Sequence, residues 1–169
     1  MKEMNLPAVT AIVVAAGASR RMGFDKLSFR LPDGRTVLQT SCDALAAHPA
    51  VTGLVLVCGG NRTECEAIAA RCTKPCTVVQ GGATRADSVR SGLAAAEGEL
   101  VAIHDAARPF VSKAVITAAL TAAAADGAAA PAVPVKDTIK IADGAGRVAA
   151  TPDRASLYAV QTPQCFRRS

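Results

Sequence analysis

The sequence predicts an α/β fold, with a mostly parallel β-sheet that carries helices on both faces. First, apolar segments with strand character alternate with segments of helical periodicity along most of the chain. Second, half of the 169 residues are hydrophobic but only 3% are aromatic, so alanine and valine build a core that packs by close helix–sheet contact. Third, this length suits one domain with a real core.

The first half of the chain predicts two strand–helix pairs. Val9–Ala15 is an apolar run that reads as a buried strand. Thr36–Gln39 fits a capping box, and apolar residues at helical spacing follow it. Leu54–Cys58 is a second buried strand, which ends at a glycine pair. A second capping-box pattern, Asn61–Glu64, predicts a helix that continues to about Arg71.

The alternation continues in the second half. Cys76–Gln80 is predicted to be a strand and also ends at a glycine pair, and Ala86–Ala96 has helical spacing. Leu100–His104 is a further strand. Ser112 is placed to cap an alanine-rich helix, and Ala128–Val133 is predicted to be another strand.

The pattern changes after Val135. Thr138–Ile141 and Arg147–Ala150 are short and β-prone, and the turn residues Asp143–Gly146 join them. We therefore predict a hairpin that projects from the sheet.

The formal net charge of +5 bears on the class of partner. The basic residues are spread out, often beside acids, and few aromatic residues are available to stack on bases, so we expect a small anionic substrate and no nucleic acid. No apolar run reaches the ~18 residues of a membrane span, and the N-terminus lacks signal-peptide character. We expect a cytoplasmic protein with no membrane partner.

The six cysteines do not form a metal-binding pattern. No CxxC pair occurs, and no histidine lies near the closest two, Cys72 and Cys76. We expect buried thiols that act as small hydrophobic side chains, and no metal site made by side chains.

Three segments that follow predicted strands carry chemistry: Ala15–Lys26, Gly81–Ser88 and His104–Pro109. Ligands of parallel sheets bind outside the carboxyl ends of the strands, so these segments predict one site. In the first, small residues free backbone N–H groups for anionic oxygens, and Arg21 and Lys26 add positive charge, as a triphosphate requires. The pattern is neither GxGxxG nor GxxxxGK[ST]. The alternative for this segment is a basic surface loop.

The other two segments suit a nucleotide and a second substrate. Gly81–Ser88 leads from a glycine turn into a helix N-terminus, which favours anions, and Ser88 is placed for a base or ribose. The alternative is an ordinary turn with Arg85 and Asp87 paired on the surface. The position of Asp105 at the end of a strand suggests that it contacts a metal or the substrate. The alternative is a surface salt bridge between Asp105 and Arg108. His104 alternates away from Asp105 and is expected to be structural.

Taken together, these segments resemble the 2-C-methyl-D-erythritol 4-phosphate cytidylyltransferase family. The matching runs, in family order, are Ala15–Gly17 with Arg20–Met22 and Lys26, Gly81–Gly82 with Arg85–Val89, His104–Pro109, Pro134–Lys140, Asp153–Arg154 and Gln161–Gln164. The first run is shared with other nucleotidyltransferases. The combination of His104–Pro109 with Asp137–Thr138 and Thr162–Gln164 is much more specific.

Three departures from the family pattern stand out. The gap from Met22 to Lys26 is short and lacks the usual proline, and Met-Gly-x-Asp-Lys is similar to the molybdopterin nucleotidyltransferases. Ala83 stands where the family often has an aspartate. After Gln164–Ser169 the family continues with a Thr-Asp-Glu stretch, a substrate-binding lysine and a last strand and helix. We expect the 169 residues to be a truncated form of a longer chain, and the activity of this form to be doubtful.

The resemblance implies a Rossmann-like nucleotidyltransferase sheet over residues 1–169, a single domain with a dimerisation arm at about 138–159. It implies transfer of a cytidylyl group from CTP to 2-C-methyl-D-erythritol 4-phosphate, with release of pyrophosphate, in non-mevalonate isoprenoid synthesis. It also implies a homodimer, and Mg²⁺ bound mainly through the CTP phosphates.

Residue roles follow from the matched positions. The implied nucleotide contacts are Ala15, Ala16, Gly17, Ala18, Gly82, Ser88 and Ala107. The implied catalytic charges are Arg21, Lys26 and Arg154, the last reaching the partner's site. The implied contacts to the acceptor, a small phosphorylated polyol, are Asp105, Arg108, Thr138 and Thr162.

Two alternatives stay open. One is a molybdenum-cofactor nucleotidyltransferase, which the spacing of Met22–Lys26 favours but the later motifs do not. The other is a non-enzymatic nucleotide-binding protein.

Overall fold

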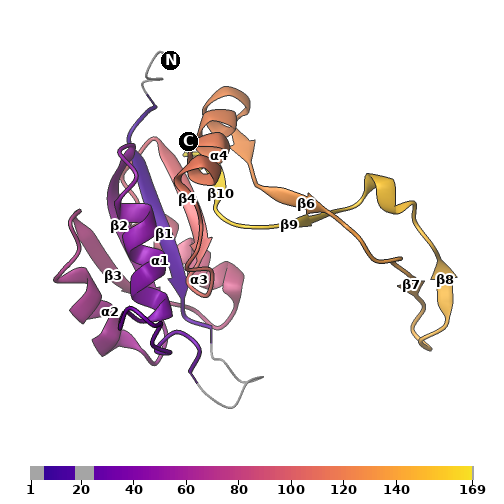
Figure 1. Cartoon of the computed structure of the whole chain (residues 1–169), viewed down its shortest axis with the longest axis horizontal. Helices are drawn as coiled ribbons and strands as arrows, with labels where there is room; N and C mark the ends of the chain where they lie inside the picture. Colours follow the sequence, from indigo (N-terminus) through magenta and orange to yellow (C-terminus); the bar gives the residue numbers. More distant parts are fainter. Residues whose placement is uncertain (1–5, 18–24, 169) are drawn as a thin grey trace.

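A computed structural model describes residues 6–17 and 25–168 of the chain, and these form a six-stranded sheet with a long arm (Figure 1). The strand order is β3-β2-β1-β4-β10-β5. The strands are β1 (Val9–Ala15), β2 (Val51–Cys58), β3 (Cys76–Gln80), β4 (Leu100–Asp105), β5 (Ala128–Ala129) and β10 (Gln164–Arg167). β1 to β4 pair in parallel, whereas β10 runs antiparallel to both β4 and β5. The expected mostly parallel sheet is confirmed.

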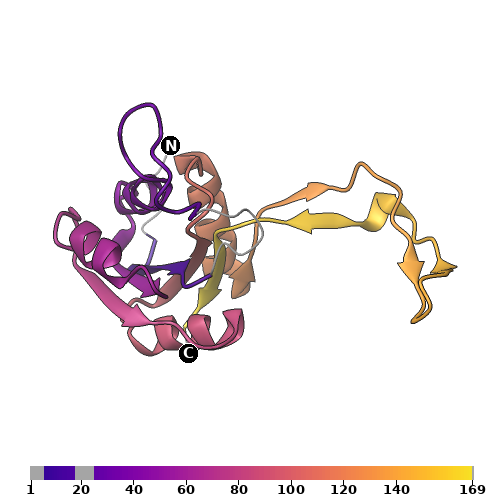
Figure 2. The ribbon, with the colours of Figure 1, turned by 90° about the horizontal axis from the view of Figure 1, so that it is seen from below.

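Helices cover both faces of this sheet, as predicted. They are α1 (Val37–Ala46), α2 (Arg62–Ala69), α3 (Arg85–Ala94) and α4 (Lys113–Asp126). Successive residues of β1 serve two cores, because side chains alternate along a strand: Val13 packs with α1, α2 and α4, while Ile12 packs with α3. Figure 2 shows α1 and α4 on one side of the sheet and α3 on the other.

Local capping explains where most of these helices begin. The Thr36 hydroxyl accepts the N–H of Gln39, and the Ser112 hydroxyl accepts the N–H of Val115, as the sequence predicts. The predicted capping box at Asn61 is wrong: its side chain makes no cap bond. Its Oδ1 instead accepts the N–H of Gly59 at 3.0 Å, so it stabilises the turn that leads out of β2.

The arm is a long excursion between β5 and β10. β6 (Ala132–Pro134) pairs with β9 (Tyr158–Val160), and farther out β7 (Ile141–Ala142) pairs with β8 (Val148–Ala150); a short 3₁₀ helix, η1, spans Arg154–Ser156. Figure 1 shows the arm extending away from the sheet. The projecting hairpin is confirmed, with strands shorter than expected.

Two expectations about this half of the chain are corrected. The predicted strand Ala128–Val133 is split into β5, in the sheet, and β6, in the arm. Pro131 lies at the break, where it has no N–H to offer a sheet and its carbonyl accepts the N–H of Gln161 at 2.8 Å. β10, which was not predicted, pairs with the free side of β4. Within the described ranges no helix is long and apolar enough to cross a membrane.

Candidate functional site

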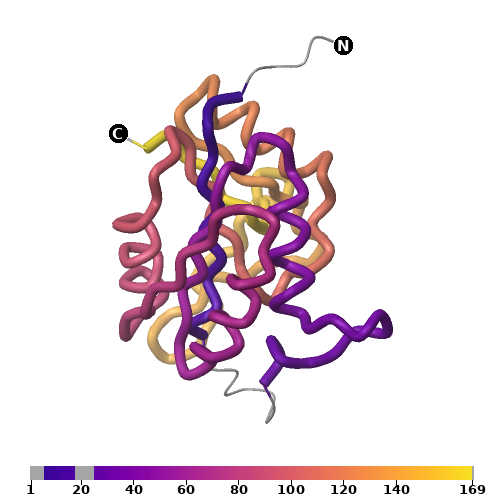
Figure 3. The backbone as a smooth tube through the Cα atoms, turned by 90° about the vertical axis from the view of Figure 1, so that its left-hand side faces the viewer, coloured from indigo at the N-terminus to yellow at the C-terminus, as the bar shows by residue number. Residues whose placement is uncertain are grey.

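The site lies where the strand order reverses direction, between β1 and β4. The chain of β1 continues to β2 on one side, whereas β4 flanks β1 on the other, and ligands of parallel sheets bind at such a point, beyond the carboxyl ends of the strands. Figure 3 shows this end of β1 at the bottom, opposite the last described residues of the chain. Because β10 is antiparallel to β4, its entry segment, which includes Thr162, also lies at the site end.

The turns after β1, β2 and β3 approach one another too closely for larger side chains. A Cβ at Gly81 would lie 2.4 Å from the Cβ of Ala16, and one at Gly59 would lie 2.9 Å from the Ala16 carbonyl oxygen. The N–H of Gly81 donates to the Cys58 carbonyl at 2.7 Å. Of the predicted triphosphate turn, Ala15 is buried and Gly17 exposed, so the backbone opens to solvent at this point.

Ser88 stabilises the turn after β3 through hydrogen bonds to its backbone. It is 2% exposed, its hydroxyl donates to the Thr84 carbonyl at 3.0 Å, and it accepts the N–H of Gly82 at 3.2 Å. A Cβ at Gly82 would lie 2.3 Å from the Cβ of Asp87. Gly82 itself is exposed, so Ser88 holds in place the backbone that the sequence assigns to the nucleotide.

Arg85 and Asp87 do not pair with each other, which corrects the surface-pair alternative. Asp87 forms a reciprocal capping box with Thr84, and the hydroxyl of Thr84 lowers the pKa of this carboxyl. Asp87 pairs with Arg90 instead, at 3.0 Å. The Arg85 side chain reaches instead to the end of β4.

The carboxylate of Asp105 lies between two arginines. Arg85 Nη2 is 2.8 Å from its Oδ1, and Arg108 Nε is 3.7 Å from its Oδ2. The ion pair with Arg108 that was weighed as an alternative is present, and a closer one with Arg85 joins the start of α3 to the end of β4. All three side chains are partly exposed, so each pair contributes only about 0–1 kcal/mol. An incoming phosphate can therefore compete for these guanidinium groups.

Arg85 was considered above only as a surface partner of Asp87, although its position carried a signal. A cation in the first turn of a helix is unfavourable there because of the helix dipole, so it needs an anionic partner. That partner, Asp105, is 20 residues away, at the end of β4. Gln161 is a second such residue, since its amide oxygen accepts a hydrogen bond from Arg108 Nη1.

His104 points away from Asp105, as predicted, and is fully buried. Its Nε2 lies 3.0 Å from the Arg108 carbonyl oxygen, and its Nδ1 lies 3.0 Å from the hydroxyl of Thr162. The same hydroxyl is 3.3 Å from the Asp105 N–H. Burial lowers the pKa of His104. Thr162 is 7% exposed, so its hydroxyl is engaged by the protein before any substrate arrives.

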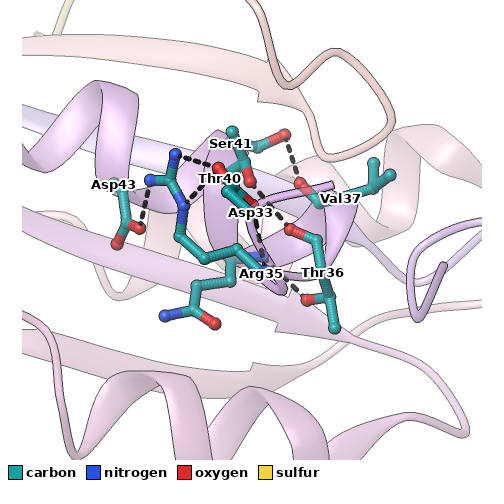
Figure 4. A network of polar contacts seen from close by, with 8 residues as sticks. Asp33, Arg35, Thr36, Val37, Thr40, Ser41 and Asp43 are labelled. Carbon is teal, nitrogen blue, oxygen red and sulfur yellow. Dashed lines mark hydrogen bonds and ion pairs between the residues drawn. The ribbon is translucent and has the colours of Figure 1, made fainter. Parts of the chain in front are cut away.

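Arg35 ties the loop before α1 to that helix, and α1 in turn contacts the site through Ser41. Figure 4 shows Arg35 between two carboxylates, with Nη2 at 2.7 Å from Asp33 and Nη1 at 3.0 Å from Asp43. On α1, the Ser41 hydroxyl lies 2.6 Å from the Ala106 carbonyl oxygen. The turn that follows β4 is therefore held from α1 as well as from Thr162.

The structure does not gather every predicted residue at the sheet. Thr138 and Arg154 lie on the arm, where Arg154 Nη1 donates to the Lys136 carbonyl at 2.9 Å. Lys26 and Ala107 are exposed at the site end. Ala18 and Arg21 fall outside the residues that the structure describes.

Acidic and thiol groups in the described part of the chain do not form a metal centre. No group of three or more histidine, cysteine, aspartate or glutamate side chains there could hold an ion. The six cysteines are free thiols: Cys42, Cys58, Cys65 and Cys165 are buried as expected, whereas Cys72 and Cys76 are partly exposed, which corrects the expectation for these two. Burial raises the pKa of Cys65, Cys76 and Cys165 to about 12.

Comparison with known proteins gives consistent matches. A family model described as 2-C-methyl-D-erythritol 4-phosphate cytidylyltransferase matches residues 9–169. The chain is 46% identical over 165 residues to a bifunctional enzyme IspD/IspF of Anaeromyxobacter dehalogenans, covering 95% of this chain and 42% of the relative. It is 45% identical over 166 residues to a 2-C-methyl-D-erythritol 4-phosphate cytidylyltransferase of Desulforamulus reducens, covering 94% of this chain and 70% of the relative.

A solved structure extends this similarity to the fold. The 4-diphosphocytidyl-2C-methyl-D-erythritol synthase of Anaerococcus prevotii superimposes with a TM-score of 0.81 at 31% identity, over 95% of this chain and 70% of that one. The chain thus spans less than half the length of the bifunctional relatives that it matches.

Proposed function

The chain belongs to the 2-C-methyl-D-erythritol 4-phosphate cytidylyltransferase family, and from this premise we propose that the protein transfers a cytidylyl group from CTP to 2-C-methyl-D-erythritol 4-phosphate and releases pyrophosphate. The observation that carries the proposal is the convergence of three loops at one end of the sheet. One offers a close-packed turn of small residues, and the other two bring Arg85 and Arg108 to a shared carboxylate.

This arrangement suits a reaction between two phosphates. The acceptor phosphate is already an anion, so it attacks the α-phosphorus in line and needs neither a general base nor a covalent enzyme intermediate. Catalysis then consists of positioning and of neutralising charge on the α-phosphate and the leaving pyrophosphate. We assign that neutralisation to Lys26 and Arg21, and base and ribose contacts to Gly82 and Ala107.

The acceptor would bind beside Asp105 and Arg108, at the end of β4. Its phosphate competes with Asp105 for Arg108, and the carboxylate, once released, can accept a hydroxyl of the polyol. Because Arg85 also pairs with Asp105, the carboxylate keeps a partner throughout. Mg²⁺ would bind mainly through the CTP phosphates, since this hard cation retains waters and substrate oxygens as ligands, and it would neutralise phosphate charge there.

We further propose that the protein is a homodimer joined through its arm. The short two-stranded sheets of the arm expose several apolar side chains: Val133, Ile141, Val148, Tyr158 and Val160. Such surface favours burial against another protein. Thr138 and Arg154, which lie out on the arm, would then serve the partner's site. We place the protein in the cytoplasm, where its six free thiols would stay reduced.

Measurement of nucleotide and acceptor preference tests the proposal. Pyrophosphate release should require CTP together with the methylerythritol phosphate, and calorimetry should show weaker binding of UTP and GTP, because a site built on hydrogen bonds rejects bases that leave its groups unpaired. Equal binding of GTP, with turnover of a molybdopterin acceptor, would instead support the alternative that the Met22–Lys26 spacing favours. Binding of CTP without any turnover would support a non-enzymatic protein.

A further inference from the structure

We propose that His104 is a positioning residue for the acceptor site, a neutral imidazole that carries its proton on Nε2 and fixes the Arg108 turn against Thr162. The proposal rests on the proposed function, because it assigns His104 to the acceptor half of that site. His104 touches no substrate in this role. It acts through the two residues that it holds.

The tautomer follows from counting donors and acceptors. The Arg108 carbonyl can only accept, so His104 Nε2, at 3.0 Å, must donate to it. The Asp105 N–H can only donate, so the Thr162 oxygen accepts there, at 3.3 Å. The hydroxyl proton of Thr162 is then available to donate to His104 Nδ1, which accepts at 3.0 Å. One assignment thus satisfies every group of the relay.

A charged ring would break this assignment. It would present a second N–H to the Thr162 oxygen and leave the hydroxyl proton of Thr162 without its acceptor. The neighbouring charges act in opposite senses, because Asp105 favours the charged ring and Arg108 disfavours it. Burial is the largest influence and lowers the pKa of His104, in agreement with the neutral form.

The relay joins segments that are far apart in the sequence. Asp105 and Thr162 are separated by 57 residues, and the second of them lies where the arm returns to the sheet. The guanidinium of Arg108 contacts both Asp105 and Gln161, so fixing the Arg108 carbonyl also limits where this guanidinium can point. An apolar side chain of similar size would fill the space of His104 but would leave the Arg108 carbonyl and the Thr162 hydroxyl without these partners.

His48 provides a matched control. It is also buried, at 3% exposed, and its Nε2 lies 3.0 Å from the hydroxyl of Thr117. Burial lowers the pKa of His48 as well. However, it lies just before β2, at the opposite end of the sheet from the site loops. Replacement of either histidine removes a buried imidazole and its contact with a threonine hydroxyl, but only His104 adjoins the acceptor residues.

The experiment uses the full-length protein with His104→Leu, His104→Gln and His48→Leu. We expect His104→Leu to raise the KM for methylerythritol phosphate or lower kcat by about 10²-fold, the effect of a misplaced binding group, while the dissociation constant for CTP stays near that of the wild type. His104→Gln, which retains an N–H donor for the Arg108 carbonyl, should recover part of the loss. His48→Leu should leave both constants near their wild-type values.

A second measurement needs no variant and guards against loss of folding. Nitrogen-15 NMR of the wild-type imidazole rings at neutral pH should report His104 protonated at Nε2 and unprotonated at Nδ1. The opposite tautomer or a charged ring would overturn the proposal. So would equal effects of His104→Leu and His48→Leu on the acceptor constants, with wild-type turnover intact. Absence of turnover in the wild type, in contrast, would contradict the proposed function itself.

Discussion

The charges at the site end are arranged so that arginines outnumber the carboxylates that they contact. The single carboxylate of Asp105 pairs with both Arg85 and Arg108, and the side chains of both ion pairs are partly exposed to solvent. Exposed ion pairs of this kind are weak, so a ligand that replaces one of them has to supply little free energy to break it. Under the proposed function, these weak pairs keep the arginines in place and can still release them to the phosphate of the acceptor.

The sharpest test of a single residue is Lys26→Ala. Lys26 is exposed at the site end, and we assign it to the charge that grows on the phosphates during transfer. Loss of one such contact typically costs about 10²–10³-fold in turnover, whereas binding of ground-state CTP should weaken far less. Pyrophosphate release and calorimetry give the two values. Lys74→Ala, in the turn before β3 at the other end of the sheet, is the control and should behave as the wild type.

The buried ring of His104 predicts a pH dependence of stability. Its pKa is lowered from 6.5 in the folded protein, so the unfolded chain binds more protons at mildly acidic pH. The contribution of the neutral ring is complete above pH 6.5 and is lost as the pH falls through the interval between that value and the folded pKa. Within that interval the free energy of unfolding should fall by about 1.4 kcal/mol per pH unit for this residue.

Urea denaturation of the wild type and of His104→Gln over a series of pH values checks this dependence. The variant should show a flatter curve below pH 6.5. Curves of equal slope would mean that His104 takes up its proton without loss of stability, contrary to the burial that the structure shows.

At the scale of elements, the turn between β3 and α3 depends on glycine. We expect Gly81→Ala to destabilise the fold by about 1–3 kcal/mol, because the new Cβ would have to displace Ala16 and Ser88. CTP binding should weaken as well, since the same movement disturbs Gly82. Thermal denaturation and calorimetry measure the two effects. Gly60→Ala adds its Cβ in open space and serves as the control; a similar loss in both variants would refute the steric explanation.

Elements were predictable from the sequence where local signals determine them. The helices that begin at Thr36 and Ser112 were found through their caps, and the buried strands through continuous apolar runs. β10 was missed because it buries only one side chain, Cys165, and therefore has no recognisable periodicity. Its place in the sheet comes from pairing with β4, which is distant in the sequence.

The candidate site was predictable to a similar extent. Its loops could be located, because all of them follow strands of one parallel sheet. The contacts between these segments could not be predicted from the sequence. Examples are the contact of Arg85 with Asp105 and that of His104 with Thr162. Such contacts depend on which strand ends become neighbours, and strand order is a property of the whole sheet.

At the scale of the molecule, the arm separates Arg154 from the site end of its own chain. If Arg154 serves a partner's site, mixing Arg154→Ala with Lys26→Ala should restore activity that neither variant has alone. In a mixed dimer one site carries both substitutions and the other carries neither. After unfolding and refolding an equal mixture, we expect about a quarter of the wild-type activity, from random assortment of the two chains.

As a control, each variant is unfolded and refolded alone in the same way, and each should stay inactive. A mixture that remains as inactive as its components would place both residues in the site of one chain and remove the case for an arm that crosses to a partner. Sedimentation of the refolded samples confirms that dimers have formed.

The order of strands in the sheet also has a consequence for biosynthesis. β1 to β4 all lie within residues 9–105, so the parallel part of the sheet can assemble while the rest of the chain is still being made. Until β10 arrives, β4 is an unprotected edge with open backbone groups. Every nascent chain therefore passes through an interval, as long as synthesis of α4 and the arm, in which it can pair wrongly. Chaperone capture should be greatest in that interval, and ribosome-bound chains arrested before and after residue 167 would reveal it.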